Sequence, residues 1–275
     1  MAIFHLRVNT LSRSSGRSSV GAAAYRSGER LVNALSGSVH DFGRKQGIGF
    51  SAVLLPEGAP VWLGERQRLW NAVEQSETRC NSRTARELVL ALPVELSEGQ
   101  QVELLTGFVQ AQMVERGMVA DVNLHDAASH NPHAHVMLTT RVVGPDGFGA
   151  KVRDWNRVEL VQAWREGWEA ACNAALEESG SAVRVDHRTL FAQGIQREAT
   201  RHHGVPGGFA CFKPVQPVTP SPVSTLSPLA NAGQVRPDFD TAFRAAMAQP
   251  ISAAHLGEMD SLNARTGRLQ GQTRL

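Results

Sequence analysis

Apolar and polar residues alternate along several short stretches of the chain, and apolar residues recur at helical spacing in longer ones. Alternation at every second position is typical of a half-buried strand, whereas recurrence every three or four positions is typical of a helix with one buried face. The short stretches predict strands at residues 2–9, 37–42, 48–55, 85–92, 119–125, 133–143 and 182–190. The longer ones predict helices at residues 18–35, 63–80, 97–116 and 157–178.

The predicted helix at residues 97–116 has the clearest boundaries. Ser97 can cap its first turn, Gln100 completes a capping box, and Gly117 ends it. The two strands that follow, at 119–125 and 133–143, are joined by a loop too short for a parallel crossover. Interleaved helices and antiparallel strands predict an α+β domain in which helices flank a mainly antiparallel central sheet, in two or three layers.

The composition changes after residue 204. It predicts a folded domain at 1–204, a Pro/Ser/Thr-rich linker at 205–236 and a short tail at 237–275, partly helical (238–247) or disordered. Three widely spaced cysteines provide no disulfide framework and indicate a reducing cytoplasm. No apolar run could span a bilayer and no signal peptide is evident, so we expect a cytoplasmic protein.

Charge is unevenly distributed, although the net value is only +2. Residues 1–50 hold a clear excess of basic over acidic side chains, which indicates a local polyanion site. Arg26 and Arg30 are four residues apart and would share one face of the predicted helix, where they could bind phosphate. A solvated surface could have the same composition. The candidate residues for such a polyanion site are Arg13, Arg17, Arg26 and Arg30.

The single tyrosine of the sequence, Tyr25, lies in the middle of this predicted helix. Small residues flank it: glycine and alanine occupy positions 21–24, and Gly28 follows. Such neighbours leave room for a bulky group to approach the phenol hydroxyl. A packed aromatic side chain in a surface helix is the alternative interpretation.

Histidines are concentrated around the predicted hairpin at residues 119–143. His133 and His135 are two apart on one strand and therefore point to the same face, and His125 ends the neighbouring strand. Three neutral imidazoles would form a metal site with positions left for water or substrate oxygens. A surface cluster, or His130 in place of one ligand, stays open. Two further histidines are expected to be structural: His5 and His40.

A small-residue helix with Tyr25, followed by His and Asn-Pro-His-Ala-His (131–135), resembles the conjugative relaxases of the MobA/MobL (MobQ) group. These belong to the His-hydrophobe-His endonucleases. The resemblance covers residues 1–204 and departs at Phe42, where such proteins often have tyrosine. Further matching stretches are Val39-His40-Asp41, Trp70-Asn71-Ala72-Val73-Glu74, Ala85-Arg86-Glu87, Gly117-Met118-Val119-Ala120-Asp121, Trp155-Asn156 and Asp186-His187-Arg188.

The resemblance implies that Tyr25 attacks a phosphate of one DNA strand at a plasmid transfer origin. This would leave a 5′-phosphotyrosyl link and a free 3′-hydroxyl, which can rejoin the strand without ATP. It also implies that the four arginines contact neighbouring phosphates. The implied partners are single-stranded DNA, accessory relaxosome proteins and a type IV secretion coupling protein.

The resemblance also implies a divalent cation, Mg²⁺ or Mn²⁺, held by His125, His133 and His135. Glu87 is a catalytic candidate, and Asp121 a weaker one, either to orient a ligand histidine or to accept the tyrosine proton. Each could equally be an ordinary strand residue. A non-catalytic origin-binding module with a structural metal site is the main alternative. A rolling-circle replication initiator is another, although such proteins place the tyrosine after the histidines.

Overall fold

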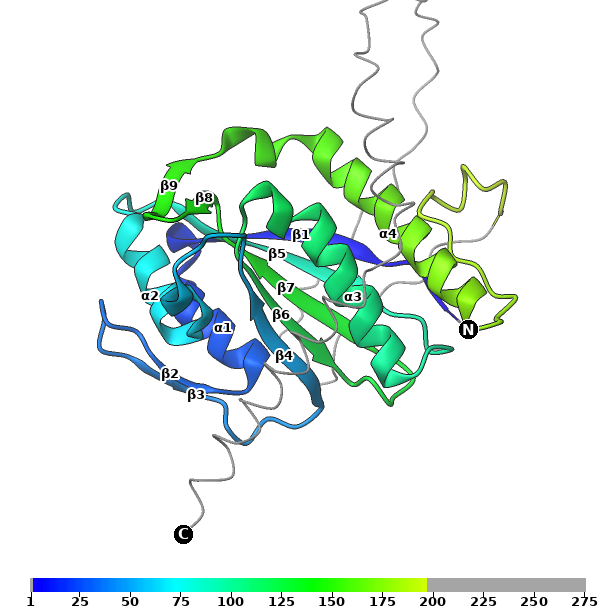
Figure 1. Cartoon of the computed structure of the whole chain (residues 1–275), viewed down its shortest axis with the longest axis horizontal. Coiled ribbons are helices and arrows are strands. Elements are labelled where there is room, and N and C mark those ends of the chain that lie inside the picture. Colours follow the sequence, from blue (N-terminus) through cyan, green and yellow to red (C-terminus); the bar gives the residue numbers. More distant parts are fainter. Residues whose placement is uncertain (1, 197–275) are drawn as a thin grey trace, which may run out of the picture. The chain divides into compact units, whose positions relative to one another are not determined.

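The computed structural model describes residues 2–196. A five-stranded sheet lies at the centre of the domain (Figure 1). Its strand order is β1-β5-β7-β6-β4, and every neighbouring pair is antiparallel. The predicted α+β class with a mainly antiparallel sheet is therefore confirmed. The strands are β1 (Leu6–Ser12), β4 (Ile48–Leu54), β5 (Arg83–Ala91), β6 (Ala120–His125) and β7 (His133–Leu138).

Helices cover both faces of the sheet, so the domain has three layers. On one face lie α1 (Ser19–Ser27) and α2 (Arg66–Ser76), together with the hairpin of β2 (Arg30–Val32) and β3 (Val39–Asp41). On the other face lie α3 (Glu98–Gln112) and α4 (Val158–Glu178). Smaller elements are the hairpin β8 (Arg141–Gly144) with β9 (Gly147–Lys151) and the 3-10 helices Arg13–Ser15, Val61–Gly64, Val114–Arg116 and Arg153–Asn156.

Alternation along the strands separates two hydrophobic cores. Leu88, Leu90 and Val136 point toward α3 and α4, where they join the tryptophans Trp164 and Trp168. The opposite face is apolar at only some positions, such as Ala85, Val119 and Met137. Buried polar residues occupy other positions of that face: Glu87, Asp121, Asn123 and His125. A polar strip thus lies between the sheet and the α1–α2 layer.

The predicted helix around Tyr25 is too long. Ser18 caps α1 as expected, because its hydroxyl accepts a hydrogen bond from the Gly21 amide, but the helix ends at Gly28 in a left-handed conformation (φ 68°). The chain then turns back as β2, so Arg30 lies on a strand and does not share a helix face with Arg26. A Cβ atom at Gly28 would lie 2.4 Å from Ile48 Cδ1, which explains why glycine occupies this turn.

Most other predicted helices and strands are of the correct type, but their boundaries in the structure differ from the predicted ones. The α3 capping box of Ser97 and Gln100 is confirmed. The first strand begins at Leu6, the strand predicted at 133–143 ends at Leu138, and residues 182–190 form no strand. No helix among residues 2–196 combines the length and apolarity needed to cross a bilayer. The linker, the tail and the helix predicted at 238–247 lie outside the described residues.

A buried ion pair connects the sheet to α2. Arg66 Nε lies 3.0 and 2.9 Å from the two carboxylate oxygens of Asp121, whose side chain is fully buried, and Trp70 Nε1 donates to the same carboxylate at 2.8 Å. These bonds occupy Asp121, so its predicted alternative role in orienting a ligand histidine or accepting a proton has no support in the geometry. Asp121 instead fixes α2 on the sheet.

We expect Asp121→Ala to lower the free energy of unfolding by about 3–5 kcal/mol, because it leaves the buried Arg66 with only the half-exposed Glu29 as an anionic partner. The matched control is Asp154→Ala, which removes an exposed partner of Arg157 and should cost less than about 1 kcal/mol. Urea denaturation followed by circular dichroism measures both. Equal losses in the two variants would contradict the assignment of Asp121 as a structural anchor.

Candidate metal centre and nucleophile

The three predicted histidines meet at one end of the polar strip. His125 on β6 is directly opposite His133 on β7, and His135 lies two residues further along the same face. Their ring centroids are 5.0–5.4 Å apart, and one ring nitrogen from each lies within 4.8 Å of the others. His130 belongs to no such group within the described residues. The structure therefore brings together the set predicted from the spacing.

Each ring has one nitrogen engaged by an oxygen atom of the protein. His125 Nε2 is 2.7 Å from the Arg26 carbonyl, His133 Nδ1 is 2.9 Å from the Asn131 carbonyl, and His135 Nδ1 is 2.8 Å from Glu87 Oε1. A carbonyl or carboxylate oxygen only accepts, so these three nitrogens carry the hydrogens. The other nitrogen of each ring keeps a lone pair for a metal, as a second shell of acceptors commonly arranges.

Burial favours the neutral form of two of these rings, His125 and His135. It lowers the pKa of His125 to about 4, an effect that the Arg26 carbonyl opposes and nearby Lys45 reinforces. Burial also lowers the pKa of His135, against the opposing influence of Glu87. Neutral imidazole is the form that binds a metal ion. The donor set fits a first-row transition ion better than Mg²⁺, which prefers oxygen ligands.

Glu87 lies behind the histidines and is almost fully buried. Burial alone would raise its pKa, but hydrogen bonds from His135 and from Arg26 Nε (2.5 Å) lower it to about 2. Both bonds reach the same oxygen, Oε1. A carboxylate held ionised in this way is suited to orienting His135 and is a poor proton acceptor. The geometry thus favours the first of the two roles considered for Glu87.

Tyr25 lies beside this centre, near the end of α1. Its neighbour Arg26 contacts the centre twice, through its carbonyl to His125 and its side chain to Glu87. The Tyr25 side chain is 49% exposed and packs edge-on against Phe42, with ring centroids 5.2 Å apart. Lys45 Nζ lies 3.9 Å from the ring centroid and donates to the Tyr25 carbonyl at 2.8 Å. The phenol is thus held by its neighbours and open to solvent.

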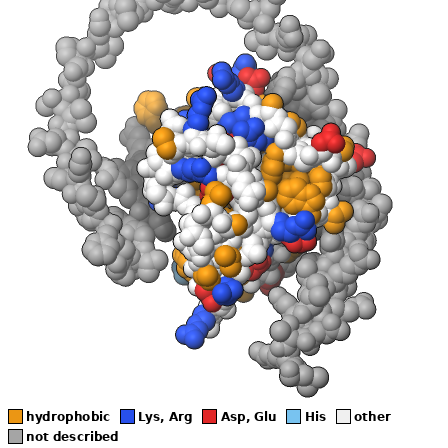
Figure 2. Space-filling view, turned by 90° about the vertical axis from the view of Figure 1, so that its left-hand side faces the viewer, with side chains coloured by type: hydrophobic (Ala, Val, Ile, Leu, Met, Phe, Trp, Pro, Cys, Tyr) orange, Lys and Arg blue, Asp and Glu red, His pale blue; other side chains and the backbone are white. Residues whose placement is uncertain are grey.

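The four candidate DNA-binding arginines have different environments. Arg13 and Arg26 are engaged by buried glutamates, Glu74 and Glu87, and Arg30 lies 3.8 Å from Asp41 on an exposed surface. Arg17 is exposed and has no hydrogen bond or ion pair within the described part of the chain. Figure 2 shows basic side chains spread over the side that carries α1 and α2. Of the four, Arg17 is the one free to meet an incoming phosphate.

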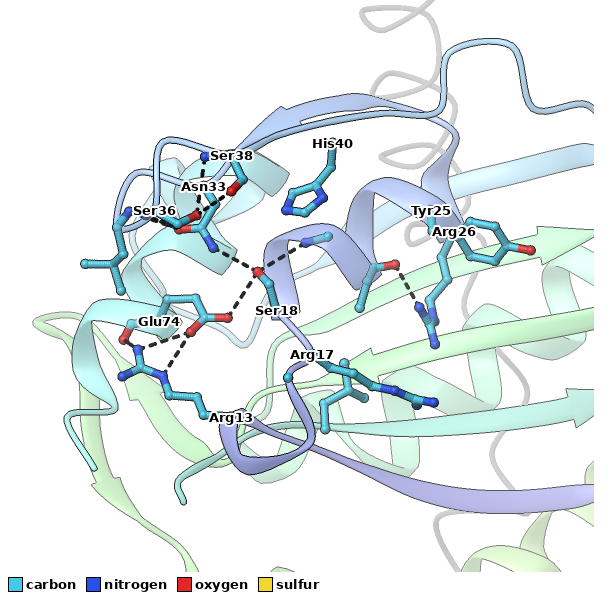
Figure 3. A pocket seen from close by; sticks show the side chains of 15 residues that line it. Arg13, Arg17, Ser18, Tyr25, Arg26, Asn33, Ser36, Ser38, His40 and Glu74 are labelled. Carbon is cyan, nitrogen blue, oxygen red and sulfur yellow. Dashed lines mark hydrogen bonds and ion pairs between the residues drawn. The ribbon is translucent and has the colours of Figure 1, made fainter. Parts of the chain in front are cut away.

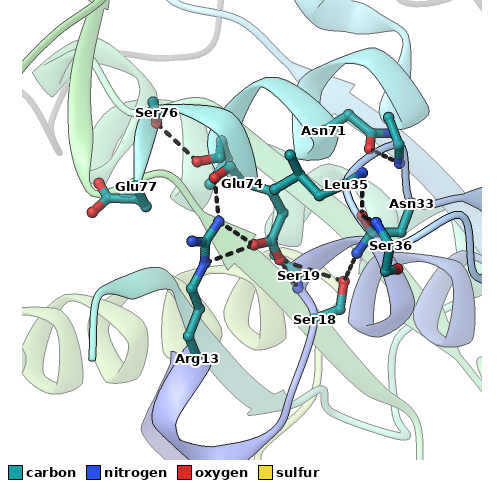
Figure 4. Close-up of polar contacts among 12 residues, drawn as sticks. Arg13, Ser18, Ser19, Asn33, Leu35, Ser36, Asn71, Glu74, Ser76 and Glu77 are labelled. Atoms are coloured by element: carbon teal, nitrogen blue, oxygen red, sulfur yellow. Dashed lines mark hydrogen bonds and ion pairs between the residues drawn. The ribbon is translucent and has the colours of Figure 1, made fainter. Parts of the chain in front are cut away.

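Two contributions were missed from the sequence. Lys45 was not among the candidate residues, since nothing in the pattern shows that its turn folds back onto Tyr25. Glu74 lies in one of the stretches that match the family but was given no role. Its Oε1 accepts from the Ser19 amide and hydroxyl, both at 2.7 Å, and its Oε2 accepts from Arg13 (Figure 4). Glu74 thereby fixes the start of α1 and hence the position of Tyr25.

A second cluster of possible metal ligands lies at the end of the domain: Glu169, Asp186 and His187. The Glu169 carboxylate accepts from both the backbone amide and Nδ1 of His187. Arg165 also binds the His187 carbonyl. These bonds tie the segment after α4 back onto that helix, so the cluster has a structural explanation.

Comparison with known protein families gives a match that includes the residues of this site. The model of the MobA/MobL family matches residues 17–207, more than half of the chain. The chain belongs to the MobA/MobL family. The match includes Tyr25, Glu87 and all three histidines of the centre, and it ends close to the boundary predicted for the folded domain.

Relatives carry names from DNA mobilization. The chain is 36% identical to the mobilization protein MobL of Acidithiobacillus ferridurans, over 74% of this chain and 62% of that protein. It is 32% identical to a probable mobilization protein MobA of Bifidobacterium longum, over 74% and 43%. This chain thus spans less than two thirds of the length of either relative.

A solved structure has the same fold. That structure concerns the molecular basis of vancomycin resistance transfer in Staphylococcus aureus. It matches this chain with a TM-score of 0.65 at 32% sequence identity. The match covers 68% of this chain and 100% of that one. The three-layer arrangement described above is therefore shared with an experimentally determined relative.

Proposed function

We propose that this MobA/MobL protein is a metal-dependent relaxase, which nicks one DNA strand at a transfer origin and holds the 5′ end on Tyr25. The observation that carries the proposal is the contact between the tyrosine helix and the three-histidine centre, made by Arg26 with His125 and Glu87. The mobilization proteins among its relatives support the biological setting. Accessory relaxosome proteins and a secretion coupling protein are the partners we expect.

Side chains of the protein position each part of the proposed site. His125, His133 and His135 would hold a divalent cation, which would draw negative charge from the oxygens of the scissile phosphate. Glu87 holds the ring of His135 and the side chain of Arg26 in fixed orientation. Phe42 and Lys45 limit the directions that the Tyr25 ring can take. Such preorganisation lowers the barrier by positioning the reacting groups before the reaction starts.

Strand transfer needs no oxidant or nucleotide cofactor. The Tyr25 oxygen forms a bond to phosphorus as the bond from phosphorus to the 3′ oxygen breaks, and the phenol proton passes to solvent. The 3′ oxygen leaves and takes up a proton. The reverse reaction, attack by a 3′-hydroxyl on the phosphotyrosine, rejoins the strand. Because one phosphodiester replaces another, the bond energy is conserved.

The proposal is tested by searching for a covalent protein–DNA adduct. Labelled single strands that tile both strands of the DNA flanking the gene are incubated with the full chain and Mn²⁺, then separated on a denaturing gel. The relaxase proposal predicts a shifted band with one subset of strands and none when EDTA is present. Binding to a strand without any adduct would instead support a non-catalytic origin-binding module.

Glu87→Gln should lower the affinity for Mn²⁺ about 10- to 100-fold, the usual cost of losing a partner that orients a metal-binding histidine. The amide lacks the negative charge that holds His135 and Arg26. Isothermal titration calorimetry measures this affinity. The control is Glu103→Gln on α3, an exposed glutamate on the other face of the sheet. Unchanged Mn²⁺ affinity in Glu87→Gln would remove this residue from the centre.

A further inference from the structure

A cavity of about 820 Å³ opens next to Tyr25, along the first part of α1 (Figure 3). Its walls come from α1, from the turn of the β2–β3 hairpin and from the 3-10 helix after β1. Tyr25 and Arg26 contribute to this wall as well as flanking the histidine centre. Any strand whose phosphate lies at Tyr25 therefore has neighbouring nucleotides within reach of the cavity.

Most polar groups of the cavity are already engaged in holding its walls together. Asn33 donates to Ser18 Oγ at 2.9 Å and accepts from the amides of Leu35 and Ser36. Glu74 binds Arg13 and the start of α1, as Figure 4 shows. These contacts make a preformed pocket, because the side chains that shape it are fixed by bonds to one another.

Among the lining residues, His40 and Arg17 carry side-chain nitrogen atoms that have no partner in the described part of the chain. No hydrogen bond or ion pair to either side chain exists within residues 2–196. Of the two His40 ring nitrogens, Nε2 is closed off from solvent, so Nδ1 is the one that can meet a ligand. The His40 ring lies against α1 at Gly21, where an added Cβ would be 2.9 Å from its Cε1 atom. Glycine is needed for this approach. His40, expected from the sequence to be structural, instead forms part of a cavity wall.

The cavity is too large for a phosphate alone and falls within the range of small-molecule pockets. Its lining also includes two exposed hydrophobic side chains, Tyr25 (49%) and Leu35 (57%). Aromatic and apolar surfaces beside a cationic group are what single-stranded nucleic acid binds, through stacking of bases and contacts to phosphates. Arg17 is the exposed cation at this cavity.

We propose that this cavity takes up one base of the DNA strand beside the phosphate that Tyr25 attacks, with His40 contacting the base edge and Arg17 the adjoining phosphate. The proposal depends on the relaxase function for the identity of the strand. It makes His40 a specificity-determining residue and Arg17 a residue that contributes affinity without sequence preference.

A binding selection tests the proposal without requiring cleavage. The full chain carrying Tyr25→Phe, which keeps the ring but cannot react, is incubated with a pool of random single-stranded oligonucleotides, and the bound fraction is sequenced. The selection is repeated with variants of this Tyr25→Phe chain that also carry His40→Phe, His40→Gln or Arg17→Ala. A variant that also carries Arg157→Ala is the control for an exposed arginine elsewhere. Thermal unfolding confirms that each variant is folded.

His40→Phe and His40→Gln should reduce the base preference at one position by about 5- to 100-fold and leave other positions unchanged. Arg17→Ala should weaken binding to all sequences and reduce the salt dependence by about one unit of slope, whereas Arg157→Ala should do neither. An identical preference with and without the imidazole, or no preference in the parent, would overturn the base-binding proposal. Failure of the relaxase function is seen separately, as the absence of a covalent adduct in the wild-type chain.

Discussion

A Tyr25→Phe protein is expected to form no covalent adduct with DNA under any condition in which the wild type does. The change deletes only the hydroxyl that would bond to phosphorus and keeps the ring that packs on Phe42 and Lys45. The sequence contains no second tyrosine to replace it. Binding to single-stranded DNA should fall by no more than about fivefold, the equivalent of one hydrogen bond. A denaturing gel and fluorescence anisotropy measure the two effects.

The control for this variant is its folding. Tyr25 is half exposed, so Tyr25→Phe should unfold within a few degrees of the wild type, a shift of about 1 kcal/mol or less. If the folded variant still gives an adduct that survives denaturation, another residue is the nucleophile and the mechanism is wrong. Loss of both adduct and binding would indicate a structural role for the phenol.

His135→Ala is expected to abolish metal binding and adduct formation together. It removes one of three donors and also leaves Glu87 without its imidazole partner. The loss of Mn²⁺ affinity should therefore exceed the roughly 10- to 100-fold expected when only an orienting partner is changed. Isothermal titration calorimetry measures the Mn²⁺ affinity, and the denaturing gel measures adduct formation in the same variant. His130→Ala is the matched control, because His130 is exposed and outside the group.

Three results would contradict this expectation. Equal Mn²⁺ affinity in His135→Ala and wild type would remove the residue from the ligand set. An equal loss in His130→Ala would indicate that the loop histidine enters the centre. A loss of metal binding with normal adduct formation would show that the cation is structural and that the strand transfer proceeds without it.

The histidine centre could be predicted from the sequence because it depends on strand geometry alone. His133 and His135 share a face by the two-residue period of a strand, and the short loop before them forces an antiparallel partner. His125 then falls opposite His133 in the observed register. The same logic located the sheet and its class. Local rules were sufficient wherever the interacting residues lie on neighbouring strands of one hairpin.

The surroundings of Tyr25 could not be predicted in this way. The helix was extended past Gly28 because Glu29 to Leu35 contain no strong helix breaker, yet β2 pairs with β3 and ends it earlier. Which arginines are free depends on glutamates 61 residues away, such as Glu74 for Arg13 and Glu87 for Arg26. Contacts of that separation leave no periodic signal in a single sequence.

The cavity beside Tyr25 is a further case of this kind. His40 on β3 meets Gly21 on α1 only because the hairpin folds back over the helix. From the sequence, His40 was expected to be a structural histidine in a short strand, and nothing in the pattern placed it beside α1. Arg17, by contrast, was selected from the local charge excess, and its exposed, unpaired position in the described structure agrees with a role in contacting phosphate.

Peptide mapping of the covalent adduct tests the central claim most directly. The wild-type chain is reacted with single-stranded DNA and Mn²⁺, treated with nuclease and digested with trypsin, which releases the peptide from Ser18 to Arg26. Mass spectrometry should find this peptide carrying a 5′-linked nucleotide on Tyr25, with fragment ions that place the added mass on the phenol. A nucleotide on any other peptide, or cleaved DNA with no modified peptide, would contradict the proposed mechanism.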